Sequence, residues 1–316
     1  MLSTGVQDFR IALGILGGIG TVTNLATLSA LWFVRIGSEF TRILLRSQCI
    51  FDGYSCFIML LYQMVGSQIK TGSPIADEIL CYIWADVNLF WPGYILGVQN
   101  NVCISLDRLL AVLCPVKYKL HKFSLKIGVC LYLSISTVFL FIPNFFLRKY
   151  VDGECLFDLP KNGSIMEFNQ ASEIIWFLMN YLLPVTFIPV SHAVILYYAR
   201  PTRIGAPVVE TECVSRSLRK FTYTTVFMAI TLLCSHSVDE FVYLLATLNL
   251  SNYIPGSLLH DLGLVLIMIG TCTLPLVMVA TIKSVRNFMW ESTKFLFLQC
   301  KWKKPVFEEH SSTIEP

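Results

Sequence analysis

The chain has 316 residues, of which 55% are hydrophobic and 14% are charged, and its formal net charge is +3. Soluble domains carry about 25% charged residues, so this composition excludes an ordinary water-soluble protein. The small net charge gives no reason to expect nucleic acid as a partner. The eleven cysteines form no Cys-x-x-Cys pair, which disfavours a zinc or redox framework.

Seven apolar runs predict seven membrane-spanning helices, since roughly 20 apolar residues cross a bilayer. The segments between them hold most of the Gly, Pro, Asn and charged residues. The first run has no basic leader and no small-residue cleavage site, so we interpret it as a retained span and not as a signal peptide. The predicted spans are residues 11–34, 43–66, 79–113, 125–147, 174–198, 220–248 and 258–282.

The distribution of Lys and Arg predicts the orientation, because both residues resist transfer across the bilayer during insertion. With the N-terminus outside, 19 of the 24 Lys and Arg lie in inner segments. We therefore expect an extracellular segment 1–10, a seven-helix membrane domain 11–282 and a cytoplasmic segment 283–316. Two Asn-x-Ser sequons, at Asn162 and Asn249, fall in segments that this topology places outside, and are candidate glycosylation sites.

Polar residues within the first two spans indicate a polar bundle interior. Asn24 lies in the first span and Asp52 in the second. A carboxylate near the middle of a bilayer is expensive and rarely serves packing alone, so we expect Asp52 to face a hydrated interior.

The most specific motif is Asp107-Arg108-Leu109 at the inner end of the third span, followed by Pro115 and Tyr118. It resembles the signature of rhodopsin-like (class A) G-protein-coupled receptors, in which a Tyr stands in place of Leu109. The resemblance implies that Arg108 is held within the bundle at rest and is released toward a G protein in the active state. The alternative is a boundary Arg that extends to lipid phosphates.

The resemblance also implies a disulfide between Cys81, at the outer start of the third span, and Cys155 in the second outer loop. Two unrelated free thiols are the alternative. Cys81 and Arg108 are 27 positions apart, a longer separation than the family usually shows. Pro92 lies between them and predicts a kink in this helix.

Asn24 and Asp52 match polar residues of the family's first and second spans. In relatives this Asp binds sodium or titrates during activation. Here Gly270 and Leu274 stand where relatives commonly have Asn, so sodium binding at Asp52 is left open. We expect no other metal and no cofactor.

The resemblance is strong over the first three spans and looser afterwards. In the fifth span Pro189 and Tyr197 keep the family's spacing, which implies that Tyr197 meets Arg108 in the active state, although interfacial Tyr residues also serve as anchors. The sixth span lacks the family's Trp and Pro. Of the seventh-span Asn-Pro-x-x-Tyr motif, only Pro275 remains. The resemblance thus assigns the G-protein switch to Asp107, Arg108, Pro115, Tyr197 and Pro275.

Acidic and aromatic residues in the outer half of the bundle are candidates for ligand binding. Carboxylates among aromatic rings suit a cationic group through ion pairing and cation–π contact. Acids at outer helix ends are equally explained as solvated termini. The candidates are Asp86, Asn88, Phe90 and Tyr94 in the third span, and Asp239 and Tyr243 in the sixth.

The segment after the last span mixes large apolar residues with Lys and Arg, which predicts a short amphipathic helix on the inner leaflet. Cys300 lies beside Lys301 and is a candidate for palmitoylation, with a plain thiol as the alternative.

We therefore predict an all-α membrane protein of the plasma membrane, a seven-helix bundle followed by a short amphipathic helix. The resemblance implies a receptor, not an enzyme, which binds an extracellular peptide or small molecule and activates a heterotrimeric G protein. A chemosensory receptor of the same fold competes with a neuropeptide or transmitter receptor. An opsin is disfavoured, because residues 263–282 contain no Lys for retinal.

Two other protein classes are considered. A transporter or channel would be expected to show related halves, or discontinuous helices with paired charges in the membrane, and the sequence indicates neither. A nonsignalling binding protein derived from receptors would explain the weak motifs in the later spans.

Overall fold

A computed structural model describes the backbone of residues 2–67, 69–157, 164–198, 208–247, 250 and 257–302. Side chains are described for residues 8–67, 69–145, 148–156, 167–198, 222–245, 250 and 257–294. Statements below about contacts concern these residues.

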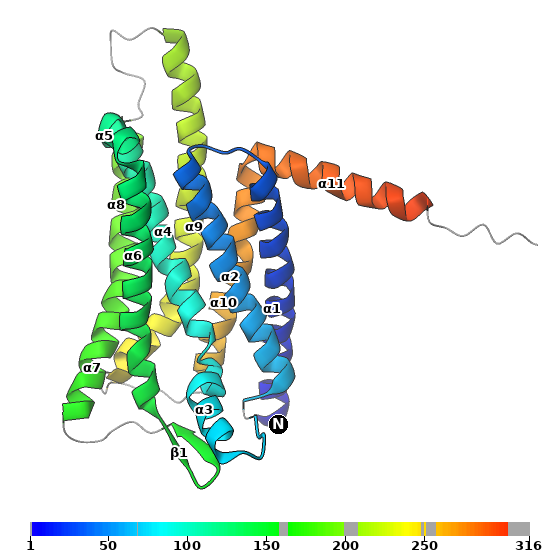
Figure 1. Cartoon of the computed structure of the whole chain (residues 1–316), viewed down its shortest axis with the longest axis vertical. Helices are drawn as coiled ribbons and strands as arrows, with labels where there is room; N and C mark the ends of the chain where they lie inside the picture. The colour runs from blue at the N-terminus through cyan, green and yellow to red at the C-terminus, as the bar shows by residue number, and fades with distance from the viewer. Residues whose placement is uncertain are drawn as a thin grey trace, which may run out of the picture.

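The described chain is almost wholly helical, with one short hairpin (Figure 1). The first half comprises α1 (Leu2–Phe33), α2 (Glu39–Val65), α3 (Pro74–Trp84), η1 (Ala85–Val87), α4 (Phe90–Leu113), α5 (Pro115–Leu120), α6 (Lys122–Phe141), η2 (Ile142–Leu147), β1 (Arg148–Val151) and β2 (Glu154–Phe157). The second half comprises α7 (Ser164–Phe177), η3 (Leu178–Leu182), α8 (Leu183–Tyr198), α9 (Val208–Thr247), α10 (Leu258–Thr281) and α11 (Lys283–Trp302).

Six helical stretches are long and apolar enough to cross a membrane, and the bent pair of α3 and α4 supplies a seventh crossing. The predicted all-α seven-helix bundle is confirmed. Several helices start earlier than predicted, among them the fifth crossing, whose helix α7 starts at Ser164 and not at residue 174. The first helix starts at Leu2, so α1 includes most of segment 1–10, which was predicted to precede the first span. No Pro interrupts the helix in this part of the sequence. The sixth crossing belongs to α9, which starts at Val208, before the predicted residue 220.

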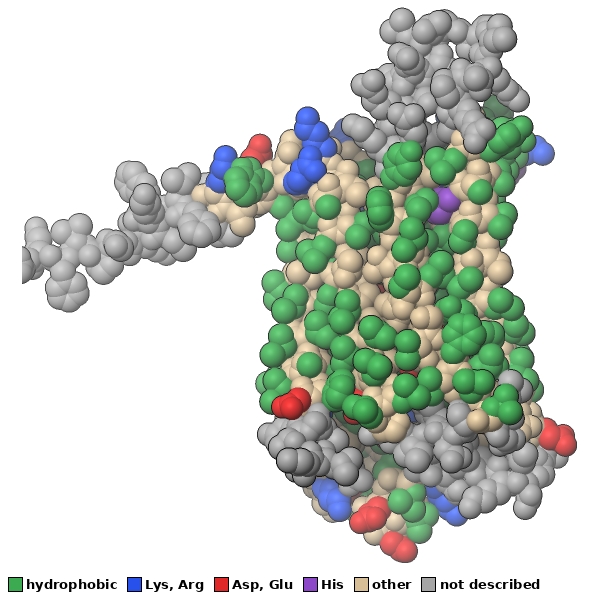
Figure 2. All heavy atoms as spheres, turned by 180° about the vertical axis from the view of Figure 1, so that it is seen from behind, with side chains coloured by type: hydrophobic (Ala, Val, Ile, Leu, Met, Phe, Trp, Pro, Cys, Tyr) green, Lys and Arg blue, Asp and Glu red, His purple; other side chains and the backbone are tan. Residues whose placement is uncertain are grey.

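Apolar side chains cover the outside of the bundle (Figure 2). Ile15 is 58% exposed and Ile135 is 65% exposed. In water such a surface would be strongly unfavourable. In a bilayer these apolar side chains contact lipid chains instead of water, which carries no such cost. The face seen in Figure 2 therefore fits a hydrocarbon setting.

The two ends of the bundle carry different elements. The hairpin end carries α3, β1 and β2, and the α11 end carries α5 and α11 (Figure 1). One cluster of buried apolar side chains, which includes Phe90 and Met268, fills the hairpin half. A second, which includes Leu44 and Met278, fills the α11 half. Phe33 of α1 stacks on Phe288 of α11 at 5.5 Å, which fixes the start of α11 to the bundle.

The third crossing is broken between α3 and α4, which meet at 49°. Asp86 (φ 50°) and Val87 (φ 59°) adopt left-handed backbone conformations, which are uncommon for residues other than Gly and costly for a β-branched residue. The predicted kink at Pro92 is wrong in its position, because the break precedes that residue. Pro92 lies in the first turn of α4, where a backbone N–H has no acceptor within the helix, so a proline is tolerated there.

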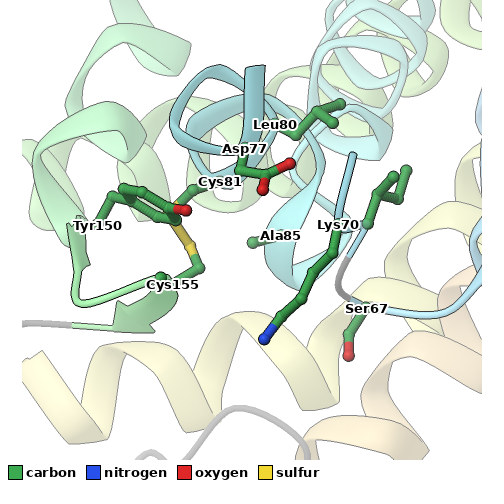
Figure 3. A pocket seen from close by; sticks show the side chains of 10 residues that line it. Ser67, Lys70, Asp77, Leu80, Cys81, Ala85, Tyr150 and Cys155 are labelled. Carbon is green, nitrogen blue, oxygen red and sulfur yellow. A yellow bond between two sulfur atoms is a disulfide. The ribbon is translucent and has the colours of Figure 1, made fainter. Parts of the chain in front are cut away.

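The hairpin is attached to α3 by a disulfide. β1 and β2 pair antiparallel with Tyr150 opposite Cys155. Cys155 is bonded to Cys81 near the end of α3, with a Cα–Cα distance of 5.3 Å (Figure 3). Ala85, the first residue of η1, lies beside this bond (Figure 3). The disulfide therefore holds the hairpin next to the break in the third crossing.

Candidate functional site

The Asp107-Arg108 pair lies at the α11 end of α4, where Asp107 is 1% exposed and Arg108 is 8% exposed. Arg108 Nε donates a hydrogen bond to Asp107 Oδ2 at 2.9 Å, and Arg108 Nη2 forms an ion pair with the same oxygen. A buried ion pair is stable only when further hydrogen bonds offset the loss of water. Neighbouring helices supply such bonds here.

Three hydroxyl groups complete the surroundings of this pair. Thr41 Oγ1 donates to Asp107 Oδ2 at 2.9 Å and accepts from Arg108 Nη2. The Tyr118 hydroxyl donates to Asp107 Oδ1 at 2.5 Å. Ser38 Oγ lies 2.9 Å from the Tyr118 hydroxyl and 2.8 Å from Thr41 Oγ1. We call these five residues the Arg108 network. It joins the starts of α2 and α5 to the end of α4.

Local sequence explains why these groups meet. Ser38 caps α2, since its Oγ accepts from the Thr41 backbone N–H at 3.1 Å. Pro115 begins α5 in a first-turn position, which turns the chain after Leu113 and returns Tyr118 toward Asp107. Burial and the bond to Asp107 raise the pKa of Tyr118, so its phenol stays protonated and acts as a donor.

Asp52 is buried near the middle of the bundle and is held by a neutral amide. Gln48 Nε2 donates to both Asp52 carboxylate oxygens at 3.0 Å. Asn100 Nδ2 donates to Gln48 Oε1 at 2.8 Å and to the Leu44 carbonyl at 2.9 Å. Asp52 is therefore tied to α4 through Gln48, a residue that sequence reasoning had not selected.

Space for an ion beside Asp52 is small. A cavity of about 10 Å³ adjoins Asp52, Ser55 and Thr271, which is close to the minimum for one water-sized particle. Asn24 is fully buried and donates to the Gly20 carbonyl of its own helix at 2.9 Å. Among the described residues, no three His, Cys, Asp or Glu side chains gather to hold a metal ion. Sodium binding at Asp52 stays a prediction.

An aromatic and acidic cluster fills the centre of the hairpin half. The Tyr94 hydroxyl donates to Glu240 Oε1 at 2.7 Å, and Glu240 is 1% exposed. The Tyr94 ring stacks on His236 at 4.8 Å and lies parallel to Trp176 at 6.2 Å. Trp91 meets Trp176 edge-on at 5.7 Å. The predicted ligand candidate Tyr94 thus connects α4, α7 and α9.

Other predicted ligand candidates occupy packed positions. Phe90 is fully buried in the apolar cluster of the hairpin half. Asn88 is also fully buried, and its Nδ2 donates to the Tyr82 carbonyl at 2.7 Å, which satisfies a carbonyl in the last turn of α3. Asp239 is 6% exposed. Tyr243 packs at the edge of the same apolar cluster.

Asp86 is the predicted ligand candidate that faces open space. Its side chain is 39% exposed, and it lines a cavity of about 280 Å³ between α1, α2, η1 and α10. Its Oδ2 lies 3.4 Å from Nε of Arg148, the first residue of β1. Burial lowers the pKa of Arg148, and the charge of Asp86 opposes that effect. The ion pair therefore joins the hairpin to the break in the third crossing.

The comparison with known families decides the class of protein. Residues 15–199 match the profile of the family described as serpentine type 7TM GPCR chemoreceptor Srx, and this match spans more than half of the chain. The chain belongs to the Srx family. A search of curated proteins found no match.

Membership of the Srx family makes the chain a multi-pass membrane protein of a G-protein-coupled receptor family, and not of an enzyme family. The predicted G-protein-coupled receptor family is confirmed, whereas membership of class A stays a prediction. The match ends next to the C-terminal end of α8, and the sequence resemblance to class A receptors also weakens over the spans that follow.

Some predicted positions of this Srx receptor remain predictions. Tyr197 is 66% exposed near the end of α8 and meets the Tyr198 ring edge-on at 5.5 Å. Pro275 lies inside α10. Asn162 and Asn249 lie outside the described residues, and Cys300 belongs to the part of α11 whose side chains are not described.

Sequence reasoning missed several groups that the Srx fold brings together. A capping signal for Ser38 and Thr41 exists in Ser38-Glu39-Phe40-Thr41, but it predicts only a helix start. Arg10 and Asp261 were not selected as candidates, although both line the 280 Å³ cavity beside Asp86. Their proximity depends on how α1 and α10 pack, which short sequence motifs do not encode.

Proposed function

We propose that this Srx chain is a chemosensory receptor of the plasma membrane that binds an extracellular ligand and activates a heterotrimeric G protein. The hairpin end faces outside and the α11 end faces the cytosol. Two observations support this orientation: 19 of the 24 Lys and Arg fall in the segments that the sequence predicts to be inner, and the Cys81–Cys155 disulfide lies at the hairpin end, where an oxidising compartment favours it.

The Arg108 network carries the proposal. In the resting state Arg108 is held by Asp107 and Thr41, and Tyr118 holds Asp107 from α5. Activation separates α2 and α5 from the end of α4 and releases Arg108 toward the G protein. Tyr197 and Pro275 belong to the part of the bundle that moves. The description of the family as chemoreceptors favours a chemosensory ligand over a transmitter or neuropeptide.

Agonist-independent nucleotide exchange tests this proposal without a known ligand. Thr41→Val keeps the shape of the side chain but removes its hydroxyl from the network. A hydrogen bond to a charged group contributes about 1.5–3 kcal/mol, so this variant raises basal exchange on the coupled G protein by about tenfold or more. Adding Arg108→Ala returns exchange to the level of the G protein alone.

The control is Thr23→Val on α1, whose hydroxyl bonds only to carbonyls of its own helix among the described residues. All variants are compared at equal surface expression, across G proteins of every major class. Unchanged exchange for Thr41→Val in all of them contradicts the proposed coupling. This outcome would leave a nonsignalling binding protein as the better account.

Transport is the second candidate, and the broken third crossing favours it. A membrane helix interrupted at a charge pair, here Asp86 and Arg148, is a common feature of transporters. The family match and the absence of internal repeats in the sequence favour the receptor. Solute uptake by proteoliposomes that contain the chain alone would support transport.

A further inference from the structure

The cavity at the hairpin end is separate from the packed cluster of Tyr94 and Glu240. It lies between α1, α2, η1 and α10, and its volume is about 280 Å³. By the same measure about 10–15 Å³ is enough for one water, so the space accepts a small molecule of ten or more non-hydrogen atoms. This size suits a small metabolite and is too small for a folded peptide.

Charges of both signs surround this cavity. Arg10 and Asp261 line it from α1 and α10, and Asp86 lines it from η1. All three, together with Arg148, interact electrostatically with Tyr62, another lining residue. Two acids and a base thus share the lining of one cavity with Tyr62, and Arg148 reaches it through Asp86.

The charged residues around the cavity differ in whether a nearby opposite charge already compensates them. Asp86 pairs with the guanidinium of Arg148 at 3.4 Å. Arg10 donates a weak bond of 3.4 Å to Gln63 Oε1, a neutral group. Asp261 lies 3.4 Å from His260, which carries charge only when protonated. Arg10 and Asp261 are thus a cation and an anion, on two neighbouring helices that line one cavity, whose described partners are neutral or weakly basic groups.

The rest of the lining mixes apolar side chains with the polar groups of Gln63, Ser67 and His260. Leu13 of α1, Val87 of η1 and Leu264 of α10 contribute to the wall, and Leu13 and Leu264 are each 3% exposed. A ligand that fits this wall has a compact apolar part between two oppositely charged groups. A ligand with a single charge would compensate only one of these two groups: Arg10, which is exposed, or Asp261, whose side chain is 15% exposed.

We propose that this cavity is the ligand site and that it binds a small zwitterionic molecule of the α-amino acid class. The ligand carboxylate pairs with Arg10, its ammonium group pairs with Asp261, and its side chain contacts Leu13 and Leu264. The proposal rests on the proposed function, because it names the ligand class of the same receptor. Val87 lines the cavity and also belongs to the break that precedes α4, so a bound ligand contacts this break.

The test measures binding by the purified full-length chain in lipid nanodiscs. Standard L-amino acids are added one at a time, and the midpoint of thermal unfolding is recorded. We expect at least one to raise the midpoint by about 2 °C or more at saturation. Its N-acetyl derivative and its methyl ester, which each lack one charge, bind at least tenfold more weakly.

Variants then locate the site. Arg10→Gln and Asp261→Asn each weaken binding of the same amino acid at least tenfold. The matched controls are Lys70→Gln and Glu78→Gln, charges near the hairpin end that do not line this cavity, and they leave binding unchanged. The proposal is overturned if no amino acid stabilises the chain, if the charge-deleted derivatives bind equally well, or if neither cavity variant weakens binding.

This result is independent of the coupling experiment. Basal nucleotide exchange by Thr41→Val needs no ligand, so it can succeed while amino acid binding fails. In that case the ligand class alone is wrong. Amino acid binding without any exchange activity would instead contradict the receptor function.

Discussion

Thr41 illustrates how a residue with an ordinary local role gains a second role in the assembled bundle. Its backbone N–H is capped by Ser38, which would be sufficient reason for this sequence at the start of α2. Its hydroxyl also contacts both Asp107 and Arg108. The same side chain therefore stabilises a helix end and compensates a buried ion pair on another helix.

Asp52 gives a prediction at the residue scale. Gln48→Leu removes both hydrogen bonds to the Asp52 carboxylate and leaves it buried without these donors. We expect a loss of about 1–3 kcal/mol in stability, measured by thermal unfolding in nanodiscs. In the double variant Gln48→Leu/Asp52→Asn the charge is gone, so the total loss is smaller than the sum of the single losses. Strictly additive losses would show that Gln48 does not compensate this carboxylate.

Single residues also show what the sequence could predict of the site. The Asp107-Arg108 pair is adjacent in sequence, so a motif revealed it. Its partners Ser38, Thr41 and Tyr118 belong to other helices, and only the packing of α2 and α5 against α4 brings them to it.

At the scale of elements, glycines determine how closely α1 and α2 pack. A Cβ atom on Gly17 would lie 2.8 Å from both the Cys56 carbonyl oxygen and the Leu60 backbone N. Backbone atoms cannot rotate away, so a larger residue there pushes the two helices apart. Close approach of this kind is typical of helix pairs in membranes, where small residues increase van der Waals contact.

The neighbouring Gly18 supplies a matched control. A Cβ atom at this position meets nothing within 4 Å. We expect Gly17→Ala to lower stability by about 1–3 kcal/mol through overpacking, whereas Gly18→Ala is neutral or slightly stabilising, because Ala favours the helix. Thermal unfolding of both variants measures the difference. Equal midpoints would mean that α1 and α2 are not in close contact at Gly17.

Helix prediction was successful where apolar length decides the structure and failed where backbone conformation does. All seven predicted apolar runs lie in membrane-crossing helical segments. The break at Asp86 and Val87 was placed at Pro92, because proline is the usual sequence signal for a kink. Left-handed conformations at Asp86 and Val87 carry no comparable signal, and they occur where the disulfide and Arg148 hold the hairpin against η1.

At the scale of the whole molecule, the α11 end and the hairpin end of the bundle hold different features. The Arg108 network binds three helices together at the first, and a 280 Å³ cavity lies between α1, α2, η1 and α10 at the second. The Asp52, Gln48 and Asn100 contacts lie between them and connect α2 to α4. A ligand that moves α2 relative to α4 at the hairpin end would therefore act on the same helices that hold Arg108.

The sequence could predict which end of the bundle faces the cytosol, but it could not predict the cavity. Lys and Arg counts and the Asp107-Arg108 motif indicated which end faces the cytosol. The cavity results from side chains of α1, α2, η1 and α10 that do not fill the space between them. Its lining includes Asp86 but not Phe90, Tyr94 or Asp239, which were selected by residue type and are packed in the structure.

The account depends most directly on Arg108 facing the cytosol, with an odd number of crossings between the two termini. Epitope tags at each end, probed in intact and then in permeabilised cells, measure this. We predict that antibody reaches the N-terminal tag in intact cells and the C-terminal tag only after permeabilisation. Labelling of both tags in intact cells, or of neither, would contradict the receptor topology.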